Sequence, residues 1–379
     1  MLELPPLSLY VHIPWCVRKC PYCDFNSHQN SGEIPEQAYV EALIKDLNND
    51  LPLVQDRKLH SIFFGGGTPS LFSAKAIESI INAVQQSIGF KDNIEITLEA
   101  NPGTFEQQKF ADFKAAGINR LSIGVQSFDD RQLQALGRIH SGQQARKAID
   151  MAYSAGFERL NIDLMHGLPK QTTTQALADL DTAINTGVTH ISWYQLTIEP
   201  NTEFFSRPPT LPVEDQLADI QEAGQIKLQQ SGFAQYEVSA FARENSVCNH
   251  NINYWQFGDY LGIGAGAHGK ITLADQNQVL RTSKTRQPKH FLAVDRSPLA
   301  TSKPLAASQL PLEFMMNGLR LTSGISADLF PVRTGLSTHS IDHKIRQLQS
   351  QGLLKNDASI YCASALGYKF LNSVLQSFA

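Results

Sequence analysis

The sequence lacks both a strong charge of one sign and any long apolar run. Its 379 residues carry a formal net charge of -4 at pH 7, without the basic excess that usually marks nucleic-acid-binding proteins, so no nucleic-acid partner is expected. No apolar run approaches the roughly 20 residues needed to cross a bilayer. The first six residues, MLELPP, have neither the basic nor the apolar part of a secretory signal. We therefore expect a cytoplasmic protein.

Cysteine is also scarce, and its distribution excludes a disulfide framework. There are five cysteines, an odd number, and three of them, Cys16, Cys20 and Cys23, fall within eight residues. In a reducing compartment such a cluster more often binds a metal or takes part in catalysis. Pro14 and Pro21 oppose a continuous helix through this segment, so we expect the three thiols to lie on a loop.

The first 230 or so residues alternate between short apolar runs and longer segments with helical periodicity, which indicates parallel βαβ units in an α/β fold. Strands are predicted at residues 7–13, 61–64, 94–98, 120–125, 159–164 and 190–196. Helices are predicted at residues 35–50, 73–88, 105–116, 142–156, 172–186 and 213–231. Six such units form either an open doubly wound sheet or an incomplete barrel, and periodicity does not separate the two.

Polar residues follow the predicted strands at their C-terminal ends. The sequence GGGTP at 65–69 follows the second strand, Glu99 the third and Gln126 the fourth, and Asp163 lies at the end of the fifth. Parallel α/β folds bind their ligands at this edge of the sheet. The sequence therefore predicts one site to which several strands contribute.

Beyond residue 232 the alternation changes, and we divide the chain there. The predicted parts are a barrel or sheet at 1–232, a flanking α+β extension at 233–294 with a strand at 236–241, a linker rich in Ser, Pro, Leu and Ala at 295–311, and a smaller unit at 312–379. In the last part, helices at 341–354 and 365–378 flank a short hairpin-like run, an arrangement similar to a winged helix.

The three loop cysteines suit an iron–sulfur cluster with an open iron. A [4Fe–4S] cluster is normally held by four thiolates, so three leave one iron free, and an open position is where a catalytic metal site takes its substrate. The alternative is a structural zinc ion, with His12 or His28 as the fourth ligand. The polar strand ends downstream, which would suit a bulky cofactor, favour iron and sulfur.

Residues 10–25, YVHIPWCVRKCPYCDF, resemble the start of radical S-adenosylmethionine (SAM) proteins related to oxygen-independent coproporphyrinogen III dehydrogenase. Within that group the chain is most similar to the HemW-type heme chaperones, over nearly its whole length. The resemblance implies a partial (β/α)6 barrel with a smaller α+β C-terminal region. It also implies a [4Fe–4S] cluster, a SAM that chelates the open iron, and one-electron chemistry supplied by the cofactor.

The resemblance also implies a SAM-binding set. Its members, each near a strand end or the cluster, are Tyr10, Gly66, Gly67, Thr68, Glu99, Gln126, Arg138 and Asp163. Simpler explanations exist for single members: GGGTP can be only a turn, Arg138 can form a surface ion pair, and Asp163 can be a buried hydrogen-bonding residue. Taken together and in order along the chain, they favour a site.

Two departures separate the chain from the dehydrogenase. The dehydrogenase pattern has a further cysteine two residues after the third ligand, where this chain has Phe25, and a long extension before the cluster loop. Both departures favour the chaperone branch, in which heme is bound and passed to an acceptor such as a membrane-associated respiratory enzyme. Coproporphyrinogen III oxidation and another radical SAM reaction, such as methyl transfer, stay as alternatives, and homodimer formation is left open.

The segment His250 to Trp255, HNINYW, matches the HNxxYW pattern that the chaperone branch associates with heme. Neutral imidazole is a good axial ligand for heme iron, so His250 is the predicted ligand, with Cys248 as an alternative. Without the resemblance, a histidine beside aromatic residues is more often a hydrogen-bonded packing residue. His268, in the Gly-rich stretch 262–269, either faces the barrel mouth or is an ordinary loop histidine.

Overall fold

The computed structural model describes residues 1–30, 32–104 and 107–379. Twelve strands of these residues form one sheet in the order β14-β13-β12-β11-β1-β4-β5-β6-β7-β8-β10-β9. Its parallel strands are β11 (Asp259–Ile263), β1 (Leu7–Ile13), β4 (Leu59–Gly66), β5 (Phe90–Ala100), β6 (Arg120–Gln126), β7 (Arg159–His166) and β8 (His190–Gln195). The six strands predicted from the sequence are all among them.

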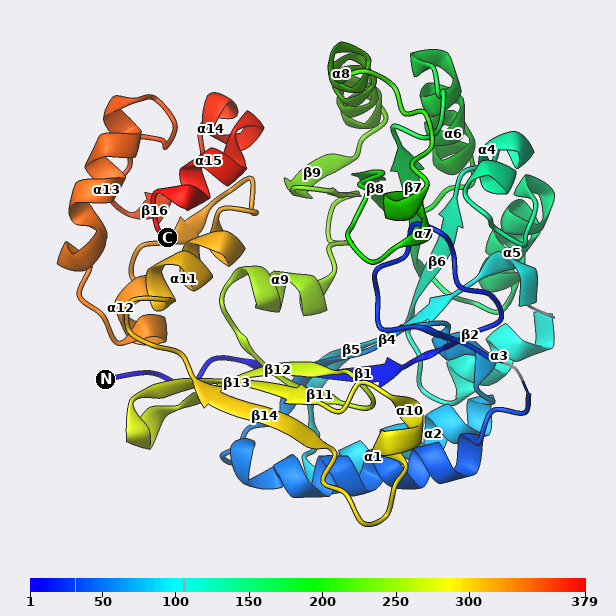
Figure 1. Ribbon diagram of the computed structural model, residues 1–379, viewed down its shortest axis with the longest axis horizontal. Helices are drawn as coiled ribbons and strands as arrows, with labels where there is room; N and C mark the ends of the chain where they lie inside the picture. The colour runs from blue at the N-terminus through cyan, green and yellow to red at the C-terminus, as the bar shows by residue number, and fades with distance from the viewer. Residues whose placement is uncertain (31, 105–106) are drawn as a thin grey trace.

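The strand order identifies the fold as a partial barrel. From β1 to β8 the parallel strands follow one another in chain order, and right-handed crossovers between sequential strands place every connecting helix on the same side. A doubly wound sheet would reverse its order and carry helices on both faces. Figure 1 shows a curved sheet with α1 (Glu36–Asp50) and α2 (Ala74–Ser87) outside its first strands. The predicted (β/α)6 architecture is confirmed.

Local sequence explains where the outer helices begin and end. α5 (Gly142–Ser154) and α6 (Thr173–Asn185) each start with a capping box, formed by Ser141 with Gln144 and by Thr172 with Gln175. A glycine with positive φ follows each helix and ends it. α3 (Gln107–Ala115) covers most of the helix predicted at 105–116, whose first two residues lie outside the described part of the chain.

The sheet continues beyond the barrel where the sequence predicted other structure. Residues 236–241, expected to be one strand, belong to the antiparallel pair β9 (Ala234–Glu237) and β10 (Ala240–Ala242), with a turn between them. The expected linker at 295–311 contains β14 (Leu299–Pro304), which pairs with β13 (Gln278–Lys284). All six residues of β14 are exposed, so this edge strand is held by backbone pairing and needs no apolar side chains.

The C-terminal region has its own hydrophobic core. It consists of α11 (Leu310–Gly318), α12 (Leu329–Thr334), α13 (His339–Ser350), α14 (Ala365–Lys369), α15 (Leu371–Gln376) and the short pair β15 (Ile325–Ser326) and β16 (Ile360–Tyr361). The helix predicted at 365–378 is interrupted at Phe370. None of the helices in the described residues is long and apolar enough to cross a membrane.

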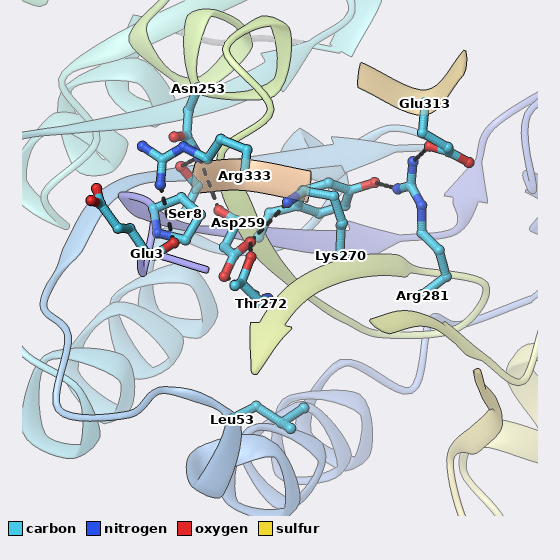
Figure 2. A network of polar contacts seen from close by, with 12 residues as sticks. Glu3, Ser8, Leu53, Asn253, Asp259, Lys270, Thr272, Arg281, Glu313 and Arg333 are labelled. Carbon is cyan, nitrogen blue, oxygen red and sulfur yellow. Dashed lines mark hydrogen bonds and ion pairs between the residues drawn. The ribbon is translucent and has the colours of Figure 1, made fainter. Parts of the chain in front are cut away.

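Ionic contacts of the antiparallel strands include a buried cluster around Asp259 and a half-buried ion pair to the C-terminal region (Figure 2). Asp259 at the start of β11 accepts hydrogen bonds from Lys270 Nζ at 2.8 Å and from the Thr272 backbone N–H at 2.8 Å, both on β12 (His268–Leu273). Arg281 on β13 pairs with Glu313 of α11. These contacts fix the antiparallel strands against the barrel, and those strands form one wall of the cavity described below.

Candidate functional site

The cysteine loop follows β1 and is held by a short parallel pair, β2 (Trp15–Cys16) and β3 (His28–Gln29). The three thiols are half-buried and free of disulfides, and burial raises the pKa of Cys16 and of Cys23. Each sulfur lies near a different polar side chain: Cys16 3.6 Å from Thr68 Oγ1, Cys20 3.5 Å from an Arg138 guanidinium nitrogen and Cys23 3.7 Å from Ser27 Oγ.

The two candidate fourth ligands of a zinc ion differ in their contacts. His28 has a buried Nε2 with no hydrogen-bond partner among the described residues, so the zinc alternative keeps one candidate. His12, a candidate fourth ligand, has both ring nitrogens engaged, with Tyr10 Oη at 3.0 Å and the Asn26 carbonyl at 2.9 Å. A [4Fe–4S] cluster takes one thiolate on each of three irons, and hydrogen bonds to its sulfurs are usual. Each of the three thiols has such a polar side chain beside it.

The GGGTP segment is shaped by close contact with the cysteine loop. A Cβ on Gly67 would lie 2.5 Å from the Trp15 carbonyl oxygen, and Gly66 has a φ of +116° that disfavours other residues. The Gly67 and Thr68 backbone N–H groups donate to the carbonyls of Ile13 and Trp15 at 2.8 and 2.7 Å. The segment is therefore more than a turn, because it braces the backbone that carries Cys16.

A chain of hydrogen bonds connects the strand ends to the cysteines. Asn101 donates to Thr68 Oγ1 at 2.8 Å and accepts from Arg138 at 2.7 Å. The same guanidinium nitrogen donates to the Gly124 carbonyl at 2.7 Å, and another reaches Cys20. Arg138 is thus not engaged in a surface ion pair but is directed by β5 and β6 toward the cluster loop.

Two half-buried carboxyl groups lie on β5 and β7, the strands on either side of β6. Glu99 accepts from the Gly66 backbone N–H at 3.1 Å, and its burial, followed by the charge of Asp163, raises the pKa of Glu99 to about 8. Asp163 accepts from Ser122 Oγ at 3.0 Å and from Asn161 Nδ2 at 2.8 Å, and burial raises its pKa. Asp163 does form the buried hydrogen bonds of the simpler explanation. Together the two carboxyls favour a cationic ligand, because a nearby positive charge stabilises their ionised forms.

Gln126 and Tyr10 complete the predicted set. Gln126 has a φ of +69° and accepts a hydrogen bond from Tyr194 Oη at 2.8 Å. Positive φ at a non-glycine residue is uncommon, and such residues are concentrated at functional sites. Tyr10 stacks on Phe63, with ring centroids 6.3 Å apart.

A cavity of about 670 Å³ opens at this edge of the barrel, within the usual size range for ligand sites. Of the predicted residues, Tyr10, Gly66 and Glu99 line it. Thr68 and Arg138 line a separate, narrow space beside Cys20. Five of the eight predicted SAM-binding residues therefore line one of these two spaces, whereas Gly67, Gln126 and Asp163 line neither.

His250 does not line this cavity. It lies in α9 (Asn249–Trp255), is 1% exposed, and its two ring nitrogens are 2.9 Å from Ser61 Oγ and 2.7 Å from Tyr254 Oη. Burial lowers its pKa to about 3. Both ring nitrogens therefore have a hydrogen-bond partner in this structure, as the packing alternative describes. Cys248 is also buried, and burial raises its pKa to about 12.

Sequence reasoning missed Asn101 and Tyr194. Asn101 comes two residues after Glu99, at the end of β5, and Tyr194 lies near the end of β8. The rule that ligand-binding residues lie at the C-terminal ends of parallel strands, which selected Glu99 and Gln126, applies to both residues. This rule could therefore have found them from the sequence.

The comparisons with known proteins agree with this geometry. The radical SAM superfamily model matches residues 10–183, and the HemN C-terminal domain model matches residues 305–370. Over the whole chain, the protein is 50% identical to "Heme chaperone HemW" of Haemophilus influenzae and 48% identical to the protein of that name in Escherichia coli, covering 99% of each.

A mitochondrial relative and a solved structure extend the comparison. The bovine "Radical S-adenosyl methionine domain-containing protein 1, mitochondrial" is 37% identical, over 98% of this chain and 86% of its own. The solved structure of coproporphyrinogen III oxidase (HemN) from Escherichia coli matches with a TM-score of 0.83 at 23% identity, over 99% of this chain and 90% of that chain, which shows a shared fold. Since relatives about half identical match from end to end, the chain belongs to the HemW family within the radical SAM superfamily.

Proposed function

We propose that this protein is a heme chaperone, which binds heme and passes it to an acceptor protein in the cytoplasm or at the membrane surface. The observation that carries the proposal is the full-length identity of up to 50% to relatives named heme chaperones. The proposed partners are heme and an acceptor such as a respiratory enzyme. A second copy of the chain is a further candidate partner.

The radical SAM family implies a [4Fe–4S] cluster and SAM, and we assign their sites as part of the proposal. Cys16, Cys20 and Cys23 hold the cluster, while Thr68 and Arg138 donate to its thiolates. When bound, the cluster supplies single electrons to SAM. The chain's own contribution is to shield the site and to fix its donors through the hydrogen bonds of Asn101.

The remaining predicted residues suit the cationic end of SAM. SAM carries a sulfonium and an ammonium group, and Glu99 and Asp163 are two half-buried carboxyls able to face them. Tyr10 and Gly66 line the cavity together with Glu99, and the absence of a side chain on Gly66 lets a ligand approach the backbone there. Gln126 lies on the neighbouring strand end, tied to Tyr194.

Coproporphyrinogen III dehydrogenation is the second candidate, because the HemN structure shares the fold over 99% of this chain. A shared fold does not carry a shared reaction. Phe25 occupies the position at which the dehydrogenase pattern has a further cysteine, and its exposed ring lines the cavity. An exposed phenyl ring at this position of the cavity favours an apolar macrocycle over a second SAM.

The proposal is tested by measuring heme transfer and coproporphyrinogen III turnover in separate assays. Anaerobically reconstituted protein is loaded with heme, freed of excess heme by gel filtration, and mixed with apomyoglobin as a probe acceptor. In parallel it is incubated with SAM, dithionite and coproporphyrinogen III. We expect heme to move to the acceptor within the assay and no decarboxylated porphyrinogen to form. Catalytic decarboxylation together with retained heme would contradict the chaperone function and support the dehydrogenase.

A further inference from the structure

The lining of the cavity at the barrel mouth has two parts. Tyr10, Gly66 and Glu99 come from the parallel strands, and Glu99 carries the raised pKa described above. His268, at the start of β12, and Arg286, just after β13, come from the antiparallel extension. The proposed function assigns the first part to SAM and does not use the second.

His268 presents an available imidazole to this cavity. Its side chain is exposed, and within the described residues no hydrogen bond engages either ring nitrogen. Burial, followed by the charges of Arg281 and Arg286, lowers its pKa, so the ring is neutral at pH 7, the form that binds iron. The backbone is firmly placed, because His268 pairs with Ser283 and a Cβ on Gly262 would lie 1.9 Å from the His268 carbonyl oxygen.

Arg286 supplies a positive charge at the same mouth. Two other cations of this wall are already neutralised: Lys284 by Asp46 and Asp50 at 2.7 Å each, and Arg281 by Glu313. In the described part of the chain Arg286 forms no ion pair, not even with Asp24, which also lines the cavity. Arg286 is exposed, and its carbonyl accepts from Asn26 Nδ2 at 2.9 Å, which anchors the loop.

Aromatic side chains also line this cavity. Tyr254 and Tyr260 pack edge to face with centroids 4.4 Å apart, and Phe25, another lining residue, is 64% exposed. Such rings pack well on the face of a porphyrin. Tyr254 belongs to the HNxxYW segment, and its hydroxyl is held by His250. The segment therefore reaches the cavity through Tyr254, with His250 behind it as a positioning residue.

We propose that His268 is the axial ligand of the heme iron, that Arg286 pairs with a heme propionate, and that His250 acts only by holding Tyr254. This assignment rests on the proposed heme binding and specifies its site. It reverses the expectation from the HNxxYW pattern, because the histidine of that pattern is enclosed whereas His268 is open to the cavity.

The test is an anaerobic heme titration of the full-length reconstituted protein and its variants, followed by the Soret band and by low-spin ferric EPR. We expect His268→Ala to lose the histidine-ligated spectrum and to bind heme at least tenfold more weakly, with free imidazole restoring the spectrum. His250→Ala should keep the spectrum with weaker binding, and His250→Gln should recover part of the affinity. Arg286→Gln should weaken binding without changing the spectrum.

His290→Ala is the matched control, because His290 is an exposed histidine that does not line the cavity; it should behave as the unaltered protein. An unchanged spectrum in His268→Ala, or its loss in a folded His250→Ala, would overturn the assignment while leaving heme binding intact. Failure of the unaltered protein to bind heme saturably would instead overturn the proposed function, and this assignment with it.

Discussion

Removing the charge of Asp259 should destabilise the protein strongly without changing its shape. The carboxylate is fully buried and contacts Lys270 Nζ at 2.8 Å and the hydroxyl of Thr272 at 2.9 Å (Figure 2). It also pairs with Arg57 at 2.8 Å. Asp259→Asn preserves volume but leaves two cations unpaired, and the Lys270 side chain is only 2% exposed. Breaking a buried pair on one side costs about 3–5 kcal/mol.

The pH dependence of this effect has a definite sign. Burial alone would raise the pKa of Asp259, but the charges of Lys270 and Arg57 lower it below its usual value. A lowered native pKa contributes stability above the unfolded pKa of about 3.9, and that contribution is lost as the pH falls through the native pKa. The difference between the two proteins should therefore be full at pH 7 and shrink below about pH 4.

Urea unfolding followed by far-UV circular dichroism measures the difference from the shift in midpoint and the slope. Asp342→Asn is the control, because its partner Arg346 is 78% exposed and 3.5 Å away, and surface pairs contribute about 0–1 kcal/mol. A loss in Asp259→Asn no greater than in the control would refute the claim that the network holds the extension to the barrel.

Three further predictions concern the site. Replacing any of the three loop cysteines with alanine should abolish the [4Fe–4S] absorbance after reconstitution, and an intact spectrum would remove that residue from the ligand set. Gly67→Ala places a Cβ 2.5 Å from the Trp15 carbonyl oxygen and should lower the iron content per chain. Gly32→Ala is the control, because no atom lies within 4 Å of the added Cβ, and it should leave the iron content unchanged. Equal iron content in the two variants would contradict the role of the GGGTP segment in bracing the cysteine loop. Because burial raises the pKa of Glu99 to about 8, its carboxyl is protonated at pH 7, and a cationic ligand prefers the ionised form. SAM affinity measured by equilibrium dialysis should rise from pH 6.5 to 8.5 and lose part of that slope in Glu99→Gln; the same slope in both proteins would contradict a role for this carboxyl.

The barrel strands could be predicted from the sequence because burial on both faces leaves a strong local pattern. In β1, Leu7, Leu9, Val11 and Ile13 are all fully buried, and such runs of branched apolar residues are typical of parallel strands. The ends of the helices could also be predicted, because capping boxes and terminal glycines depend only on residues that are close together in the sequence. Periodicity did not show the order of the strands, which separates a barrel from a doubly wound sheet.

The antiparallel extension left little local signal. Thr282 and Lys284 are buried in β13 beside exposed or half-buried neighbours, and Lys284 is tolerated there only because Asp46 and Asp50 approach from α1. Such compensation comes from residues more than 200 positions away. No short stretch of the sequence contains this compensation, so β11, β12 and β13 were not predicted.

The site shows the same division between local and distant information. Residues at strand ends, such as Glu99 and Gln126, followed from the rule that parallel strands converge at one edge. The contacts among the site residues could not be predicted from the sequence, because Arg138 and Asn101 come together only in the folded chain. For His250, a sequence pattern gives the spacing of residues but not their burial, and burial decides whether an imidazole is available to a ligand.

The most direct test of the central claim is the stoichiometry of heme binding. Anaerobically reconstituted full-length protein, titrated with heme and followed at the Soret band, should saturate near one heme per chain with a histidine-ligated spectrum. Non-saturating binding, or a spectrum without an axial histidine, would contradict the account of this protein as a heme chaperone with a single built site.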